Sequence, residues 1–330
     1  MAREKEFPML PADNAPPEPL PPVPALSEQP LPKTGPNPRQ TFSYLRGLMA
    51  SHGIEPKAKL GQNFLVDLNL LDLICKAADL GPWDSILEVG SGTGSLTGRM
   101  AEFAACVYSV EVDMDFHRLA EELVGAKDNI KLFFGDILAR KNELNPDAMA
   151  GWADWTSRHN GKHLKLVANL PYVVATPVVT NLLLSDILID RMVVMVQWEI
   201  GERMRAQVGT KDYNSMSVLL QSVADVELVR KVLPSNFYPR PKVDSAIMLI
   251  KPNPEKRAKV GNVLKFRHFL RDLYVHRRKN LRQGLIGFPG GRRDKAVVDA
   301  KLAELGIDGL GRAEALTIED HLRLCAAFSE

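Results

Sequence analysis

Residues 86–94 read ILEVGSGTG, an apolar run that ends in an acidic residue and three alternate glycines. A buried strand followed by such a turn lets a ligand approach the backbone and the N-terminus of the next helix closely. Dinucleotide-binding enzymes share this pattern. On its own the stretch therefore predicts a ligand-binding strand-turn-helix unit, and its neighbours decide which kind.

Apolar runs alternate with helical patterns on both sides of this turn. Strands are expected at residues 86–89, 107–112, 130–134, 164–168 and 192–196, and helices at 96–104, 116–124 and 175–184. Continuous apolar runs are typical of strands covered on both faces, and the alternation predicts a parallel sheet between two helical layers. Two later runs, 226–233 and 245–250, are close enough in sequence to pair antiparallel. The sequence thus predicts an α/β fold with a mostly parallel sheet.

Three regions lie outside this alternation. Residues 1–40 hold twelve of the 23 prolines, which predicts a disordered tail. Residues 139–162 are polar and are expected to form a surface excursion before the fourth strand. No strand pattern follows Pro254, so an α/β domain over 41–254 and a small basic helical domain over 255–330 are expected.

Composition excludes several classes of protein. A chain of 330 residues with 45% hydrophobic and 25% charged residues is an ordinary soluble protein, large enough for two domains. Its apolar runs are too short to cross a bilayer, and the N-terminus lacks the apolar segment of a signal peptide. Cys75, Cys106 and Cys325 lie far apart and in no Cys/His cluster, which predicts reduced thiols in a cytoplasmic protein without a metal site.

The net charge of +2 conceals a strongly basic segment. Residues 256–295 hold thirteen Lys/Arg and two acids, a net +11 that leaves −9 for the rest of the chain. If residues 263–285 form one helix, four arginines share an arc of about 60°: Arg267, Arg271, Arg278 and Arg282. Most charge runs are solvated faces, but the scarcity of compensating acids favours a phosphate backbone as partner.

Two acids follow the second and third predicted strands. Glu111 lies about 20 residues after the glycine turn, where a carboxylate can bind both hydroxyls of a ribose. Asp136 is placed to accept the exocyclic amino group of an adenine. Either acid alone is more often a helix cap or a solvated strand end. Together with the glycine turn they lie at the carboxyl edge of the sheet, where open α/β sheets bind ligands.

The fourth predicted strand ends in Asn169-Leu170-Pro171-Tyr172. The Asn169 side-chain oxygen and the carbonyls of Leu170 and Pro171 can accept N–H donors, while Tyr172 offers a π-face for stacking. The same four residues would also suit a strand end with a turn. Their position on the edge that carries the two acids favours a site for an amino group on a flat ring.

Four motifs resemble, in order, those of the ribosomal RNA adenine dimethyltransferases of the KsgA type. They are LGQNFLVD at 60–67, NLPY at 169–172, FYPRPKVDS at 237–245 and RRKNLR at 277–282. The resemblance runs from about Lys57 to the C-terminus. It implies a class I methyltransferase (Rossmann-like) fold and S-adenosyl-L-methionine as cofactor. It also implies methylation of N6 on two adjacent adenosines of small-subunit RNA within a pre-ribosomal subunit, by a protein that is expected to be monomeric and metal-free.

The resemblance assigns roles residue by residue. Asn63 and Leu65 would contact the cofactor, Gly90 its amino-acid portion, Glu111 its ribose and Asp136 its adenine, with Asn169 at the reacting centre. A target base that has left its stack would lie on Tyr172 and, on its other face, on Phe237. The alternative for Phe237 is a core aromatic.

This sequence departs from the family pattern at QWEIGER, residues 197–203, and at Tyr213-Asn214. The departures bear on RNA docking and leave the cofactor residues unchanged. Three other functions stay open: methylation of DNA adenine or protein glutamine, methylation of large-subunit RNA, and a non-catalytic role in ribosome assembly. Leu170 in place of the first proline of Asn-Pro-Pro-Tyr, together with the basic C-terminus, disfavours the first.

Overall fold

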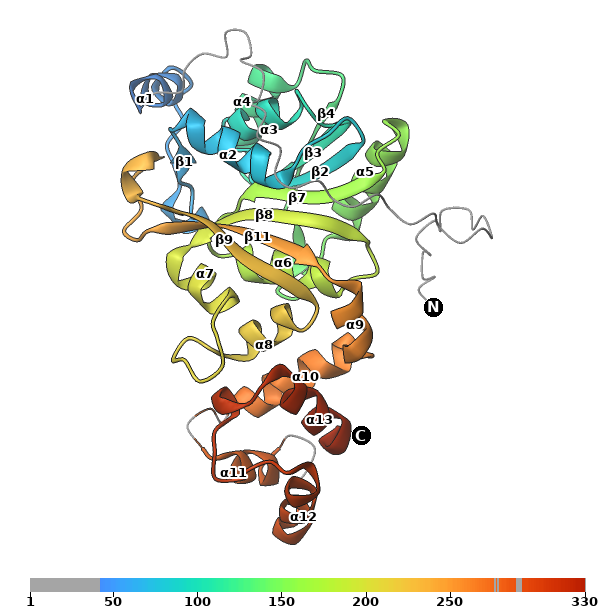
Figure 1. Cartoon of the computed structure of the whole chain (residues 1–330). Helices are drawn as coiled ribbons and strands as arrows, with labels where there is room; N and C mark the ends of the chain where they lie inside the picture. The colour runs from blue at the N-terminus through green and yellow to red at the C-terminus, as the bar shows by residue number, and fades with distance from the viewer. Residues whose placement is uncertain (1–41, 276, 278, 289–292, 330) are drawn as a thin grey trace.

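The computed structural model describes residues 42–275, 277, 279–288 and 293–329. The tail predicted over residues 1–40 lies outside the described residues, as does Arg278. Figure 1 shows a sheet with helices on both faces, and below it a group of helices from the C-terminal part of the chain.

A seven-stranded sheet forms the centre of the molecule, with the order β4-β3-β2-β7-β8-β11-β9. Its strands are β2 (Asp84–Val89), β3 (Cys106–Glu111), β4 (Ile130–Phe134), β7 (His163–Asn169), β8 (Ile189–Gln197), β9 (Ala224–Val232) and β11 (Ser245–Pro252). The strands from β4 to β8 run parallel, and β11 pairs antiparallel with both β8 and β9. The predicted α/β class and mostly parallel sheet are confirmed.

Helices follow the strands in the predicted alternation. The first eight are α1 (Phe42–Ser51), α2 (Leu68–Ala78), α3 (Ser95–Met100), α4 (Met114–Val124), α5 (Pro146–Arg158), α6 (Ala175–Leu184), α7 (Trp198–Met204) and α8 (Ser215–Gln221). The later ones are α9 (Pro254–Val260), α10 (Val263–Val275), α11 (Leu281–Ile286), α12 (Lys295–Leu305) and α13 (Ile318–Phe328). Among the helices of the described ranges, none combines the length and apolar character needed to cross a bilayer.

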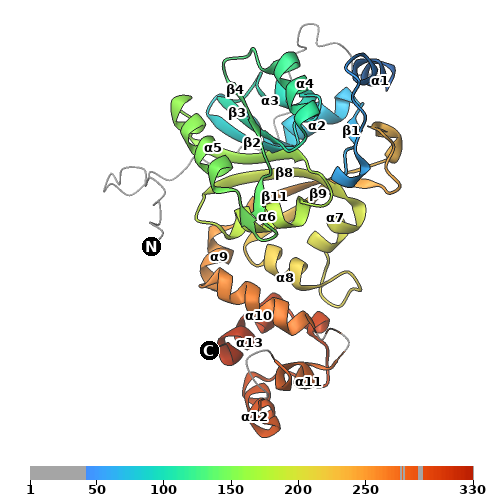
Figure 2. The ribbon, with the colours of Figure 1, turned by 180° about the vertical axis from the view of Figure 1, so that it is seen from behind.

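Alternate residues of each strand pack into two different cores. Leu87 and Leu166 belong to the core that includes α5 and α6, whereas Ile86 and Val167 belong to the core beneath α2 and α3. The two layers are visible in Figures 1 and 2, which show α2 and α6 from opposite sides. Because both faces of the strands are buried, the strands read as continuous apolar runs.

Local signals in the sequence set the start of α2. The Asp67 side chain accepts a hydrogen bond from the backbone N–H of Asn69 at 2.9 Å, as expected of an N-cap. Leu70, Leu71 and Ile74 are buried on one face of this helix. Cap and buried face together fix the direction in which residues 57–67 enter the fold.

The prediction for residues 139–162 as a surface excursion is wrong. This segment forms a small hairpin, β5 (Leu138–Arg140) with β6 (Glu143–Leu144), and then α5. Met149 and Trp152 of α5 are buried, and Trp152 Nε1 donates to Ser85 Oγ at 3.0 Å. These apolar residues have helical spacing, but they lie among polar neighbours, so the sequence pattern indicates a buried helix face only weakly. The helix is thus the crossover that lets β7 run parallel to β2.

The condition set for the arginine stripe, one helix over residues 263–285, is not met. Helix α10 ends at Val275, and α11 begins after Asn280, whose side chain accepts from the backbone N–H of Gln283 at 2.9 Å. An asparagine cap starts a new helix, so among the described arginines Arg282 lies on a different helix from Arg267 and Arg271.

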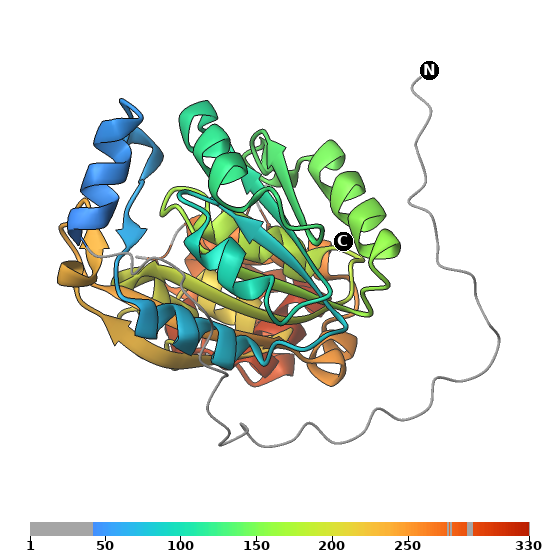
Figure 3. The ribbon, with the colours of Figure 1, turned by 90° about the horizontal axis from the view of Figure 1, so that it is seen from above.

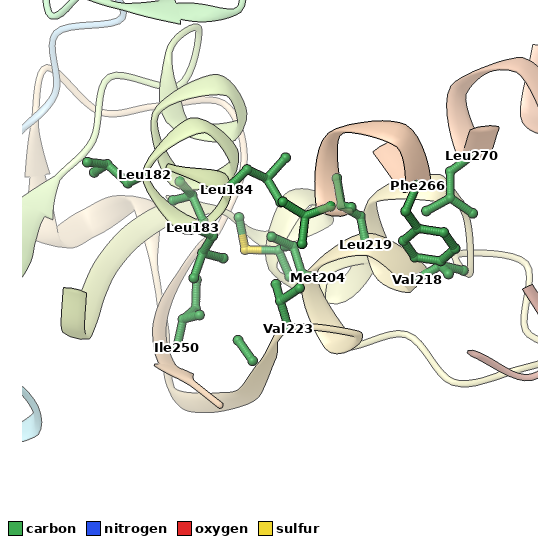
Figure 4. Close-up of a cluster of buried hydrophobic side chains, with 14 of the residues drawn as sticks. Leu182, Leu183, Leu184, Met204, Val218, Leu219, Val223, Ile250, Phe266 and Leu270 are labelled. Atoms are coloured by element: carbon green, nitrogen blue, oxygen red, sulfur yellow. The ribbon is translucent and has the colours of Figure 1, made fainter. Parts of the chain in front are cut away.

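The C-terminal helices share a core with the rest of the protein. Figure 4 shows Leu183 of α6, Leu219 of α8 and Phe266 of α10 in one apolar cluster. The Arg257 guanidinium also donates to the carbonyls of Leu183 and Ser185 at the end of α6. Residue 254 therefore separates two kinds of secondary structure, while the hydrophobic core continues across it.

Candidate functional site

The glycine turn after β2 requires glycine at two positions for steric reasons. Gly90 and Gly92 have φ angles of 86° and 53°, a region that favours glycine. A Cβ on Gly92 would lie 2.7 Å from Phe64 Cε1, and one on Gly90 would lie 3.3 Å from Pro171 Cδ. The turn is thus packed beneath the LGQNF segment on one side and beside the NLPY segment on the other.

Glu111 is held by two backbone donors at the end of β3. The Gly92 N–H donates to its Oε2 at 3.0 Å, and the Asp113 N–H donates to its Oε1 at 2.9 Å. The side chain is buried, and this burial raises the pKa of the Glu111 carboxyl above its ordinary value. Glu111 lines the cavity over the glycine turn, where its fixed carboxylate can accept further hydrogen bonds from a ligand.

Asn169 is oriented by a single hydrogen bond. Its Nδ2 donates to the backbone carbonyl of Asn63 at 2.9 Å, which identifies the other side-chain atom as the oxygen and leaves it as an acceptor. Asn63, Asn169, Leu170, Pro171 and Tyr172 all line the same cavity. The structure thus brings the predicted reacting residues together with Gly90 and Glu111.

Tyr172 is fixed by the C-terminal half of the sheet. Its hydroxyl and Ser245 Oγ at the start of β11 are 2.8 Å apart, within hydrogen-bond distance. Burial raises the pKa of the Tyr172 phenol, so the hydroxyl stays protonated at neutral pH. The ring therefore forms a firmly held wall of the cavity.

Two motifs that are distant in sequence form one structural unit. Strand β1 (Phe64–Leu65) pairs antiparallel with β10 (Phe237–Tyr238), so that Leu65 faces Phe237. Leu65 lines the cavity, as predicted for a cofactor contact, although its role there is still a prediction. Phe237 is only 2% exposed and belongs to the core beneath α2. This burial favours the alternative named for Phe237, a core aromatic, over a ring that stacks on the target base.

Asp136 lies apart from the cavity lining. Its side chain is exposed, and Oδ1 accepts the backbone N–H of Leu138 at 2.9 Å. The β3–β4 pairing places Phe134 opposite Glu111, so the loop that carries Asp136 neighbours the loop after Glu111. Contact between Asp136 and an adenine stays a prediction.

The arginines expected to form an RNA-binding stripe have other partners. Arg267 donates to Asn181 Oδ1 at 3.0 Å and to Asn142 Oδ1 at 3.1 Å, which joins α10 to α6 and to the β5–β6 hairpin. Arg271 pairs with Asp272 at 2.7 Å, and Arg282 pairs with Asp299 of α12. In the described part of the chain, Arg267, Arg271 and Arg282 do not share one helix face. Arg267 links α10 to α6 and to the β5–β6 hairpin.

Glu88 is a lining residue that the sequence analysis left without a role. It is 1% exposed and accepts hydrogen bonds from Thr97 Oγ1 at 2.5 Å and Ser109 Oγ at 2.6 Å. Burial raises the pKa of this carboxyl to about 8, so it holds a proton at neutral pH. The apolar run in front of it, at 86–87, was the signal available in the sequence, since it places the acid inside the sheet.

The cavity itself measures about 80 Å³. Sites for small molecules typically measure roughly 300–1,000 Å³. The lining combines a buried acid, a glycine turn, backbone groups and apolar side chains such as Leu71 and Leu96. Over the described ranges, no three His, Cys, Asp or Glu side chains gather as ligands for a metal ion. The arrangement suits an organic ligand with hydroxyl and amino groups, once the cavity widens.

Comparison with known proteins agrees with this geometry. The family described as ribosomal RNA adenine dimethylase matches residues 54–329. This chain belongs to that family. Proteins named ribosomal RNA small subunit methyltransferase A are similar to it. The one from Pediococcus pentosaceus is 37% identical over 87% of this chain and 93% of its own length. The one from Pelotomaculum thermopropionicum is 38% identical over 86% of this chain and 95% of its own length.

Two solved structures share the fold of this dimethylase family member. A dimethyladenosine transferase from Plasmodium falciparum has a TM-score of 0.65 and 24% identity, covering 79% of this chain and 95% of its own. The 23S rRNA methyltransferase ErmE has a TM-score of 0.58 and 24% identity, covering 81% of this chain and 99% of its own. The fold is therefore that of the class I methyltransferases, and the chain is a methyltransferase of this family.

Proposed function

We propose that the protein transfers methyl groups from S-adenosyl-L-methionine to N6 of adenosines in small-subunit ribosomal RNA, giving N6,N6-dimethyladenosine. The observation that carries the proposal concerns Asn169, which lines a cavity shared with Glu111 and the glycine turn and whose nitrogen is bound to the Asn63 carbonyl, leaving its oxygen as an acceptor. The names of the similar methyltransferases support the choice of small-subunit RNA.

The residues present fit this cofactor. Gly90 lets the amino-acid portion approach the backbone, and the fixed Glu111 carboxylate can accept both ribose hydroxyls. Asn63 and Leu65 would hold the cofactor from the side of β1. We assign Asp136 to the adenine amino group. Bound S-adenosyl-L-methionine supplies a methyl group on a positively charged sulfur, which is open to attack by a nitrogen lone pair.

Positioning of the target nitrogen is the main task of the protein. The N6 lone pair of adenine is delocalised into the ring, so the nitrogen is flat and weakly nucleophilic. The Pro171 carbonyl already accepts the N–H of Val174 at 3.0 Å, which favours the Leu170 carbonyl as the second acceptor beside Asn169 Oδ1. Two acceptors on the N6 hydrogens favour a pyramidal nitrogen that is aimed at the methyl group.

No general base is required before attack. Each transfer adds a methyl group to N6 and makes this nitrogen cationic. The cationic nitrogen then loses its proton to water. Among the described residues that line the cavity there is no histidine, which fits this scheme. Tyr172 would stack on the base after the base has left its RNA stack, a contact worth about 1–3 kcal/mol. A second transfer requires the remaining N6 hydrogen to be held by one acceptor.

A methyl-transfer assay on defined substrates tests the proposal. Radiolabelled S-adenosyl-L-methionine is given to the full chain with undermethylated small subunits, naked large-subunit RNA and DNA. We expect label in small-subunit RNA only. Label in large-subunit RNA alone would assign the chain a different RNA substrate. Binding to small subunits without label in any substrate would replace the enzyme with an assembly protein. We propose that the natural substrate is a pre-ribosomal subunit in the cytoplasm and that the enzyme acts as a monomer.

A further inference from the structure

One segment of the chain, residues 57–65, covers the cavity. Residues 60–65 line it, and the Phe64 ring lies over Gly92. Phe64 also packs on Phe116 of α4, with ring centroids 4.6 Å apart, in a cluster that includes Leu45 of α1. Figure 3 shows α1 and β1 standing beside the strand β10 segment, on one side of the molecule. The cavity beneath this segment measures about 80 Å³.

Two side chains of the cover are fastened to one carboxylate. Lys57 Nζ donates to Asp113 Oδ1 at 2.8 Å, and Gln62 Nε2 donates to Asp113 Oδ2 at 2.8 Å. The Lys57 backbone N–H in turn donates to Gln62 Oε1 at 2.6 Å. The Asp113 side chain is fully buried, whereas that of Lys57 is 40% exposed. The cover is thus held by a closed polar network at the end of β3.

The same carboxylate belongs to the loop that orients Glu111. The Asp113 N–H donates to Glu111 Oε1 at 2.9 Å, and the Asp113 side chain caps α4 by accepting from the N–H of Asp115. Burial opposes the charge on Asp113, but the hydrogen bonds from Lys57 and Gln62 outweigh it and lower the pKa of the carboxyl. Contacts therefore run without a break from the cover to the acid assigned to the ribose.

We infer that Lys57 and Gln62 are positioning residues: by binding Asp113 they close residues 57–65 over the bound cofactor and fix the loop that presents Glu111. The inference rests on the proposed function, since it concerns the same cofactor site. Both side chains bind Asp113, whereas Asn169 at the reacting centre bonds to the Asn63 carbonyl. Loss of Lys57 should accordingly weaken cofactor binding and leave the transfer step itself intact.

Calorimetric titration of the full chain with S-adenosyl-L-methionine tests this inference, together with kcat and KM for transfer. In Lys57→Met we expect Kd and KM for the cofactor to rise by about tenfold, with kcat within about twofold of wild type. Lys57→Arg should restore most of the affinity, because it keeps the charge. Lys59→Met is the matched control, since Lys59 is exposed on the same turn, and it should bind like wild type.

Wild-type affinity in Lys57→Met would overturn the inference, and so would an equal fall in kcat or a failure of Lys57→Arg to recover affinity. Failure of the wild-type chain to bind S-adenosyl-L-methionine would instead overturn the proposed function. The two failures are therefore distinguished in one titration series.

Discussion

The two ends of the parallel strands bury polar groups in opposite ways. At the amino end, Lys165 Nζ forms an ion pair with Asp84 at 2.7 Å and donates to the carbonyls of Ala78 and Asp79. At the carboxyl end, the Asn169 amide donates one internal hydrogen bond through its nitrogen, and the residue lines a cavity. Each end carries charged or amide groups, yet only one end directs them to a space for a ligand.

This difference separates residues kept for stability from residues kept for chemistry. The buried pair of Lys165 and Asp84 joins the end of α2 to the strands, because Lys165 also donates to the carbonyls of Ala78 and Asp79. Loss of one partner leaves an unpaired buried charge. A polar atom that faces a cavity adds little to folding, because it waits for a partner from outside the protein. Mutations at the two ends should therefore affect different measurements.

The largest expected effect is on methyl transfer in Asn169→Ala. Removing one of two acceptors that position the nitrogen should slow single-turnover transfer by about 10²–10³-fold. The substitution also removes the hydrogen bond from Asn169 Nδ2 to the Asn63 carbonyl, so the free energy of unfolding should fall by about 1 kcal/mol. The Kd of S-adenosyl-L-methionine should change much less than the transfer rate. Rapid-quench transfer assays, with the melting temperature measured in parallel, check this result; turnover at the wild-type rate would contradict it.

At the amino end, Asp84→Asn should affect stability instead. The substitution leaves the Lys165 charge buried with only carbonyl partners, at a cost of about 3 kcal/mol in the free energy of unfolding. Urea unfolding measures this loss, and kcat per folded molecule should stay near wild type. Asp154→Asn is the control, since Asp154 pairs with Arg158 on the exposed face of α5. If Asp84→Asn unfolded like its control, the two ends would not differ as described.

Glu88→Gln should have a smaller effect than the two preceding variants, and this effect should depend on pH. The ordinary pKa of a glutamic acid is near 4.5 and burial raises that of Glu88 to about 8, so the folded protein holds this proton more tightly than the unfolded chain. Its contribution to stability is full below pH 4.5 and declines as the pH rises to about 8. The glutamine variant should be more stable than wild type at pH 8 without cofactor, with a flatter pH profile.

Melting temperatures measured from pH 5 to pH 8 check this expectation. Glu121→Gln, on the exposed side of α4, is the control. A wild-type profile in Glu88→Gln would show that Glu88 ionises freely within the fold.

The smallest expected effect concerns the arginines of the C-terminal part. Arg267→Ala should lower the free energy of unfolding by about 1 kcal/mol, because its hydrogen bonds to Asn181 and Asn142 join two elements. The affinity of the Arg267→Ala variant for RNA, measured by filter binding, should match that of the wild type. Arg271→Ala, in an exposed pair with Asp272, is the control for stability. If the Arg267→Ala variant kept wild-type stability but bound RNA more weakly, the original prediction that Arg267 contacts RNA would be supported instead.

The sequence predicted the features that depend on short stretches of chain. The strands and the glycine turn follow from neighbouring residues, and the shared sheet edge of Glu111 and Asn169 follows from strand order. The burial of Phe237 depends on β1–β10 pairing, which joins residues far apart in the chain. The break between α10 and α11 has a local signal in Asn280, the N-cap of α11, whereas the helical spacing of the arginines continues across it.

We propose that residues at the carboxyl end of the parallel strands hold adenosine and S-adenosyl-L-methionine for methylation of N6. The most direct test is mass spectrometry of nucleosides from undermethylated small subunits after reaction with the full chain. We expect N6,N6-dimethyladenosine to appear only when S-adenosyl-L-methionine is supplied. A methyl group on a ring nitrogen or on ribose, or no methylated nucleoside at all, would contradict it.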